Sequence, residues 1–227
     1  MSLLHVKGLE AGYARIGILC DISFEVQPGE ILGVLGHNGM GKSTLLKAVS
    51  GTIAATRGAI VFEGHEMQGL PAHRRARCGI GYVPQGRQIF PNLSVRENMM
   101  MAALGTGQSA LFVDQILSMF PRLQSVLDRA GGVLSGGEQQ ILAIARCLCG
   151  KPKLMLLDEP TEGIQPSIRD EIVESLLSVR SHMGIAMLLV EQNVDFMKSL
   201  ATRVLVMEKG RLSGNSCGVT PLDHTEL

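Results

Sequence analysis

The sequence predicts an α/β fold built around a parallel β-sheet, and three features of the chain support this prediction. An apolar run at residues 31–35 leads through a glycine-rich segment into a helical pattern at residues 43–49. Two further unbroken apolar runs, at residues 154–157 and 186–190, flank another helical pattern. Unbroken apolar runs are typical of strands buried on both faces, and strands that alternate with helices pair in parallel.

The glycine-rich segment has the pattern G-x-x-x-x-G-K-[ST]. In this pattern backbone N–H groups at a helix N-terminus surround phosphate oxygens, the lysine reaches the β- and γ-phosphates, and the hydroxyl ligates Mg²⁺. An ordinary turn is the alternative in a chain with 27 glycines, but the strand-to-helix context favours a nucleoside triphosphate site. The predicted site comprises Gly36, His37, Asn38, Gly39, Met40, Gly41, Lys42, Ser43 and Thr44. His37 stands at a variable position, and we assign it no catalytic role.

The N-terminal part is predicted to be rich in β-strands. Short β-type runs occur at residues 3–9, 22–26 and 59–63, and Pro28 with Gly29 forms a turn before the first core strand. Gly51 stands where the helix after the phosphate loop should end, as a C-terminal cap.

Residues 94–132 have a helical character and are predicted to form a subdomain inserted in the α/β core. Ser94 and Glu97 match a capping box, in which each residue hydrogen-bonds the other's backbone at a helix start. Apolar residues then recur at Ile116, Leu117, Phe120, Leu123 and Leu127.

The α/β pattern resumes after this segment. Pro166 is predicted as the first residue of a helix with an apolar stripe at Ile168, Ile172, Leu176 and Val179. Residues 204–212 predict a closing hairpin, and residues 214–227 a loose polar tail. We expect residues 1–227 to form a single domain.

Composition narrows the class of protein. The formal net charge is zero, so no overall positive field attracts nucleic acid. Five scattered cysteines without a secretion signal favour reduced thiols in the cytosol, and the spacing of Cys147 and Cys149 does not predict a metal site. No apolar stretch approaches the length of a membrane span.

Two carboxylates follow the apolar run at residues 154–157. In phosphate-loop enzymes the aspartate at such a strand end holds Mg²⁺ through water, so Asp158 is the predicted metal residue. Glu159 is the predicted general base that accepts a proton from water attacking the γ-phosphate. The alternative is a solvated loop, which the upstream phosphate loop makes the weaker interpretation.

A third segment, Leu134-Ser135-Gly136-Gly137-Glu138, precedes an apolar helical pattern. Its glycines expose backbone N–H groups at a helix start, which predicts a second anion site. Ser135 and Glu138 also have the spacing of a capping box. The two interpretations are compatible.

With these motifs in this order, the chain resembles the ATP-binding subunit of an ABC transporter over essentially its whole length. The resemblance also rests on Tyr13 after Gly12 and on Gln85 in Tyr82-Val83-Pro84-Gln85. It implies a P-loop NTPase fold of the ABC ATPase type: a parallel core sheet, an N-terminal antiparallel β portion and an inserted helical subdomain. ATP and Mg²⁺ are the implied cofactors.

The resemblance further implies a head-to-tail dimer, in which each phosphate loop is covered by the signature segment of the second subunit. Tyr13 would stack on adenine, and Gln85 would bridge the metal site and the membrane partner. Ser135, Gly136 and Gly137 would contact the γ-phosphate across the interface.

Three departures from the common family pattern stand out. Glu138 replaces a glutamine and should point toward its own helix N-terminus. Gln192 replaces the switch histidine and could donate to the γ-phosphate only as a neutral amide. Gln165 replaces a loop aspartate, which weakens the case for contact between the two active sites through that loop.

Loop sequences around residues 86–95, 159–167 and 191–193 resemble the ATPases of branched-chain amino acid importers, especially those for urea and short-chain amides. The expected function is ATP-driven solute uptake at the cytoplasmic face of the inner membrane. Expected partners are a second ABC ATPase, either a paralogue or a copy of this chain, membrane permease subunits and, indirectly, a solute-binding protein. Arg87 and Phe90 are candidates for the permease contact.

Two other functions stay open at this stage. One is a non-transport ABC ATPase acting on ribosomes or nucleic acid, although such proteins usually carry tandem cassettes or a long coiled-coil insertion. The other is a nucleotide-gated regulatory module with little turnover, against which Glu159 argues.

Overall fold

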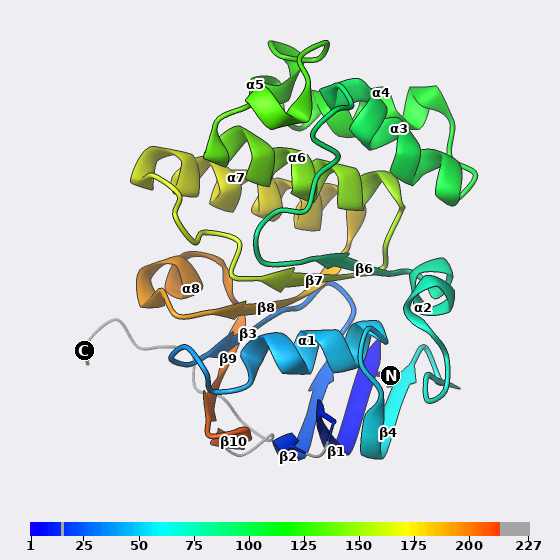
Figure 1. Ribbon diagram of the computed structural model, residues 1–227, viewed down its shortest axis with the longest axis vertical. Helices are drawn as coiled ribbons and strands as arrows, with labels where there is room; N and C mark the ends of the chain where they lie inside the picture. The colour runs from blue at the N-terminus through cyan, green and yellow to red at the C-terminus, as the bar shows by residue number, and fades with distance from the viewer. Residues whose placement is uncertain (15, 214–227) are drawn as a thin grey trace.

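The computed structural model describes residues 1–14 and 16–213, and its central element is a six-stranded sheet (Figure 1). The strand order is β10-β9-β3-β8-β7-β6, in which only the β10–β9 pair is antiparallel. The strands are β3 (Ile31–Leu35), β6 (Ile80–Val83), β7 (Leu154–Asp158), β8 (Ala186–Glu191), β9 (Arg203–Glu208) and β10 (Arg211–Ser213). The predicted parallel core and closing hairpin are confirmed, while the predicted tail at 214–227 lies outside the described residues.

A second, antiparallel sheet confirms the predicted N-terminal β portion. It has the order β2-β1-β4-β5, with β1 (Leu4–Tyr13), β2 (Ile16–Val26), β4 (Ala55–Phe62) and β5 (His65–Glu66). The first two strands extend beyond the predicted runs at residues 3–9 and 22–26. Register shifts along both pairings of β1 interrupt the alternation of inward and outward residues. The alternating pattern in the sequence therefore stops before the strands themselves end.

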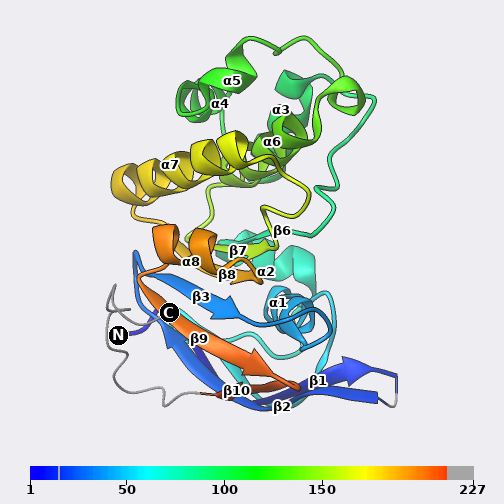
Figure 2. The same cartoon turned by 90° about the vertical axis from the view of Figure 1, so that its left-hand side faces the viewer.

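Helix α1 (Lys42–Ser50) lies between the two sheets (Figure 2). Leu45, Leu46 and Val49 are fully buried in a core shared with strands of both sheets. Gly51 ends the helix in a left-handed conformation (φ 80°), which confirms the predicted cap. Packing on both sides therefore holds the start of α1, and the loop before it, in a rigid frame.

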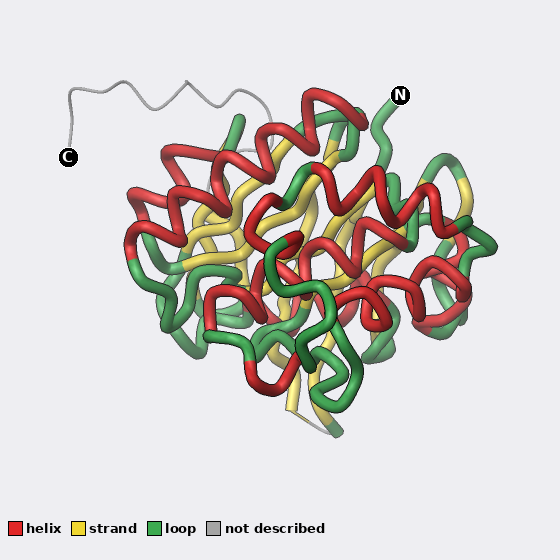
Figure 3. The backbone as a smooth tube through the Cα atoms, turned by 90° about the horizontal axis from the view of Figure 1, so that it is seen from above, coloured by secondary structure: helices red, strands yellow, loops and turns green. Residues whose placement is uncertain are grey.

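The other face of the parallel sheet is covered by α6 (Gly136–Cys149), α7 (Pro166–Met183) and α8 (Val194–Leu200), which Figure 2 labels. Seen from above, helices lie over the strands (Figure 3). Helix α7 begins at Pro166, as predicted. Ile172, Leu176 and Val179 on its apolar stripe are fully buried against the sheet side.

Beyond α6 lie α3 (Val95–Gly105), α4 (Ala110–Ser118) and α5 (Pro121–Gln124), at the top of Figure 1. The short 3₁₀ helix η1 (Gly131–Val133) precedes α6 in the chain. The capping box of Ser94 and Glu97 is present at the start of α3. Helix α2 (Ala72–Cys78) and strand β6 were not predicted, because elements this short carry too little periodicity. None of the helices in the described ranges is long and apolar enough to cross a membrane.

Candidate functional site

The phosphate loop runs from the end of β3 to the start of α1. Gly39 and Gly41 have φ angles of 80° and 105°, a left-handed conformation that side chains disfavour. The cap position of α1 is Gly41, which has no side chain to occupy the N–H groups of the first turn. The positive end of the α1 dipole is therefore open to an anion.

These loop residues line a cavity of about 360 Å³, a size typical of small-molecule sites. It brings together side chains predicted from separate parts of the sequence. The lining residues are Ile18, Asn38, Gly39, Gly41, Lys42, Ser43, Thr44, Gln85 and Glu159.

Lys42 lines this cavity and is almost fully buried. Its ammonium group donates to the carbonyl oxygens of Gly36 (2.8 Å) and His37 (3.1 Å) and forms an ion pair with Glu159 Oε1 (2.9 Å). All three N–H donors of the lysine are thus engaged. The other carboxylate oxygen of Glu159, Oε2, is buried and has no partner in the part of the chain that the structure describes.

Ser43 and Asp158 meet beside Lys42. The Ser43 hydroxyl donates to Asp158 Oδ1 (2.8 Å), and the Tyr82 hydroxyl donates to Asp158 Oδ2 (3.0 Å). Burial, followed by the charge and hydrogen bonding of Asp158, raises the pKa of Tyr82 well above its usual range, so the phenol remains a donor. Sequence reasoning assigned Tyr82 no role; its only signal was its place three residues before Gln85.

The oxygen donors of Ser43, Asp158 and Gln85 are of the kind that Mg²⁺ prefers, so these residues fit the predicted metal. Gln85 is exposed at the rim of the cavity, and its side-chain amide donates to Glu162 Oε2 (2.8 Å). This contact joins the loop after β6 to the loop that follows Glu159.

Other predicted residues do not line the cavity. Tyr13 is at the end of β1 and is 44% exposed. Gln192 is exposed in the loop after β8, where its backbone N–H donates to Glu191 Oε2 (2.9 Å). Glu191 itself is buried and was missed, since a single acidic residue at a strand end carries no specific pattern.

The signature residues Ser135, Gly136 and Gly137 form the start of α6, also away from the cavity. The predicted capping box is present: Ser135 N–H donates to Glu138 Oε2 (2.7 Å), and the Ser135 side chain accepts from Glu138 N–H (3.3 Å). Glu138 therefore points to its own helix start, as expected. These hydrogen bonds from Ser135 lower the pKa of Glu138.

The family model described as "ABC transporter" matches residues 19–162, a range that includes the phosphate loop, the signature segment and both carboxylates. The chain belongs to the ABC transporter family. A "high-affinity branched-chain amino acid transport ATP-binding protein BraG" of Pseudomonas aeruginosa is 42% identical over 227 residues, covering 99% of this chain and 97% of that protein. A probable branched-chain amino acid transport ATP-binding protein, LivF, of Archaeoglobus fulgidus is 36% identical, covering 99% and 96%.

Among solved structures, a nucleotide-free ATP-binding cassette from an ABC transporter matches with a TM-score of 0.86 and 25% identity, covering 94% of this chain and 90% of that one. The predicted P-loop fold of the ABC ATPase type is thereby confirmed. The chain is an ATP-hydrolysing subunit whose reaction is coupled to transport, and the alternative of a ribosome or nucleic-acid ATPase is not supported by these relatives.

Proposed function

We propose that this ABC ATPase drives uptake of branched-chain amino acids, urea or short-chain amides, as one of two facing ATPases at the cytoplasmic face of the inner membrane. The loop sequences that resemble such importers support the solute class, as do the two relatives whose names refer to branched-chain amino acid transport. In this proposal residues 1–227 form one domain, and residues 94–132 form its helical subdomain.

The observation that carries the catalytic assignment is the ion pair between Lys42 and Glu159. Incoming phosphate oxygens compete with Glu159 for the Lys42 ammonium, and the glutamate is released as the lysine turns to the phosphates. Glu159 Oε2, buried and without a partner among the described residues, then accepts a proton from the attacking water. Gln192 orients the γ-phosphate as a neutral donor.

Metal binding falls to three residues of the same site. Ser43 would offer its hydroxyl oxygen to Mg²⁺, Gln85 would offer its amide oxygen, and the Asp158 carboxylate would hold the ion through water. Bound Mg²⁺ would neutralise the phosphate charge that develops during transfer.

A second subunit completes each site. Ser135, Gly136 and Gly137 do not line the cavity of their own chain, and they form the start of α6, where the positive end of the helix dipole is suited to phosphate. We therefore place them over the nucleotide of a facing ATPase, with a related paralogue favoured over a second copy. Tyr13, exposed at the strand end, stacks on the adenine.

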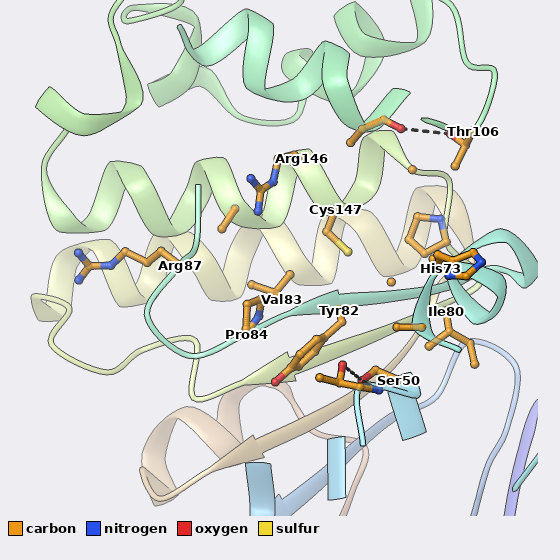
Figure 4. A pocket seen from close by; sticks show the side chains of 18 residues that line it. Ser50, His73, Ile80, Tyr82, Val83, Pro84, Arg87, Thr106, Arg146 and Cys147 are labelled. Carbon is orange, nitrogen blue, oxygen red and sulfur yellow. Dashed lines mark hydrogen bonds between the residues drawn. The ribbon is translucent and has the colours of Figure 1, made fainter. Parts of the chain in front are cut away.

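A groove of about 390 Å³ is the proposed contact for a permease subunit (Figure 4). It lies between β6 with α2 on one side and α3 with α6 on the other, and Tyr82, Val83, Arg87, Arg146 and Cys147 are among its lining residues. A cytoplasmic helix of the permease fits this groove, and the solute-binding protein acts only through the permease.

The loop that follows Gln85 is anchored to α6 at this groove. Arg87 donates to Gln139 Oε1 (3.3 Å), and Arg146 donates to Gln88 O (2.7 Å) and lies 5.1 Å from the centroid of the Phe90 ring. Movement of α6 therefore moves the loop that carries Gln85.

The test is purification of the affinity-tagged chain from membranes of its source, with the associated proteins identified by mass spectrometry. The complex is reconstituted into vesicles, and ATP-dependent uptake of labelled leucine and labelled urea is measured with the copurified binding protein present. Uptake of either solute supports the proposal. Export activity, or ATP hydrolysis stimulated by ribosomes or RNA instead of by the membrane subunits, contradicts it.

A further inference from the structure

Glu191, the last residue of β8, is a buried carboxylate to which the proposed mechanism gives no task. It is 2% exposed, and the described residues place no cation within ion-pair distance of it. Its Oε1 accepts from the backbone N–H of Thr161 (3.1 Å) and from the Thr161 hydroxyl. Its Oε2 accepts from the backbone N–H groups of Gln192 (2.9 Å) and Asn193 (3.2 Å).

Four hydrogen-bond donors converge on the Glu191 carboxylate, and this arrangement requires a side chain whose two oxygens both accept. A buried charge is costly unless hydrogen bonds replace its hydration, and hydrogen bonds to a charged acceptor are stronger than neutral ones. Glutamine would fill the same space, but one of its two terminal groups is a donor that would face the N–H groups. The loop that carries Thr161 and the loop that carries Gln192 are thus held together by a carboxylate, which only accepts hydrogen bonds.

Both loops carry residues of the catalytic site. Thr161 is two residues after Glu159, and Gln192 follows Glu191 directly. The backbone N–H of Glu159 donates to Val190 O (3.0 Å), and Glu159 itself has a φ of 45°, the left-handed region that is unfavourable for a non-glycine residue. The strained turn that carries Glu159, the proposed general base, is therefore hydrogen-bonded to the end of β8 at both Glu159 and Thr161.

We propose that Glu191 is a positioning residue for hydrolysis: it clamps the turn that presents Glu159 and fixes that turn relative to Gln192. The inference rests on the proposed role of Glu159 as the general base. Because Glu162, next to Thr161, accepts from Gln85, the clamp also sets the position of the loop that leads to the permease groove.

The test compares Glu191→Gln, Thr161→Val and Thr161→Ser in the full chain, with steady-state ATP hydrolysis and fluorescent-nucleotide binding measured on each. Glu191→Gln should lower kcat at least tenfold while KM and the nucleotide Kd stay within about twofold, since a misplaced base affects the transition state and leaves substrate binding intact. Thr161→Val should lower kcat in the same way, and Thr161→Ser, which keeps the hydroxyl donor, should restore it. Glu63→Gln, at an exposed carboxylate paired with Lys153, is the matched control and should leave kcat unchanged.

Three results would overturn the clamp: kcat of Glu191→Gln within twofold of the parent, a Thr161→Ser variant as slow as Thr161→Val, or losses of kcat and nucleotide affinity in equal proportion. Glu159→Gln is measured in parallel, so that failure of the clamp can be distinguished from failure of the proposed general-base role of Glu159. Turnover in that variant rejects the base assignment, whereas an inactive Glu159→Gln beside a fully active Glu191→Gln rejects the clamp alone.

Discussion

The Lys42 ammonium lies 2.9 Å from Glu159 Oε1, and the two side chains are only 3% and 5% exposed. The pair joins the proposed phosphate-binding lysine to the proposed general base. Each group satisfies the charge of the other, so a nucleotide that binds Lys42 must replace one interaction of the lysine with another. The pair therefore links nucleotide entry to release of the base.

Glu159→Gln should abolish steady turnover without loss of nucleotide affinity. The amide cannot accept a proton from water, and general-base assistance is worth about 10²- to 10⁴-fold in rate. Loss of the negative charge also frees Lys42 for phosphate. Phosphate release and isothermal titration with Mg·ATP check both parts; a variant that hydrolyses at the parental rate would refute the base assignment.

Lys42→Met should destabilise the fold as well as weaken nucleotide binding. It leaves the Glu159 carboxylate buried without its cation, a change that costs about 3–5 kcal/mol for pairs of this kind. The double variant Lys42→Met/Glu159→Gln removes both charges and should regain much of that stability. Urea unfolding of the parent and the two variants measures the free energies of unfolding, and a double variant less stable than Lys42→Met would contradict the buried ion pair.

Tyr82→Phe should weaken the binding of Mg²⁺ while the fold stays intact. The substitution removes only the hydroxyl that donates to Asp158 Oδ2, and a hydrogen bond to a charged group is worth about 1.5–3 kcal/mol. The Mg²⁺ concentration for half-maximal hydrolysis should rise severalfold. Tyr13→Phe, which lacks this contact, is the control, and an unchanged Mg²⁺ requirement in Tyr82→Phe would show that the contact does not orient Asp158.

Gly210→Ala tests the brace between the closing hairpin and the phosphate loop, where Gly210 N–H donates to Met40 O (2.9 Å). A Cβ at Gly210 would lie 1.8 Å from the backbone oxygen of Ile18, so the hairpin must shift. We expect a loss of about 3 kcal/mol or more in unfolding free energy.

Gly64→Ala is the matched control for this substitution. Gly64 has a similar φ (79°, against 74° at Gly210) but open space around the new Cβ. Gly64→Ala should therefore lose only about 1–2 kcal/mol of unfolding free energy, from backbone strain. Equal losses for the two variants in chemical denaturation would mean that the clash is relieved without moving the hairpin.

The thiols of Cys147 and Cys149 should resist alkylation at pH 8. Burial raises the pKa of both thiols to about 12, so the reactive thiolate is scarce even at Cys147, which is half-buried and lines the groove, whereas Cys78 is exposed. Mass spectrometry of iodoacetamide-treated protein should find Cys78 modified first, in a Cys217→Ser background because Cys217 lies outside the described residues. Modification of Cys147 at the rate of Cys78 would contradict this environment.

These raised pKa values also predict how stability changes with pH. Above pH 9 the unfolded chain releases the two thiol protons while the folded chain keeps them, so stability present below pH 9 is lost as the pH rises toward 12. The slope is about 1.4 kcal/mol per pH unit for each thiol. A Cys147→Ala/Cys149→Ala variant should show a shallower decline in urea unfolding between pH 9 and 10.5; an identical decline would refute the shift.

Much of the fold and part of the site could be predicted from local patterns. The capping boxes at Ser94 and Ser135, the glycine end of α1 and the start of α7 at Pro166 were all predicted correctly, because each depends on residues within one turn of helix. The strands β3, β7 and β8 were found because burial on both faces demands unbroken apolar runs.

The sequence by itself thus determined the strand, loop and helix of the phosphate site and the acidic end of β7. Tertiary structure alone decided that Lys42 forms an ion pair with Glu159, that Tyr82 donates to Asp158, and that Glu191 accepts from Thr161. The physical reason is that these partners lie on different parallel strands of one sheet, or on the segments that directly follow those strands. Their contact depends on the register of β3, β8, β7 and β6, which is set by packing across the whole sheet and is absent from any short stretch of sequence.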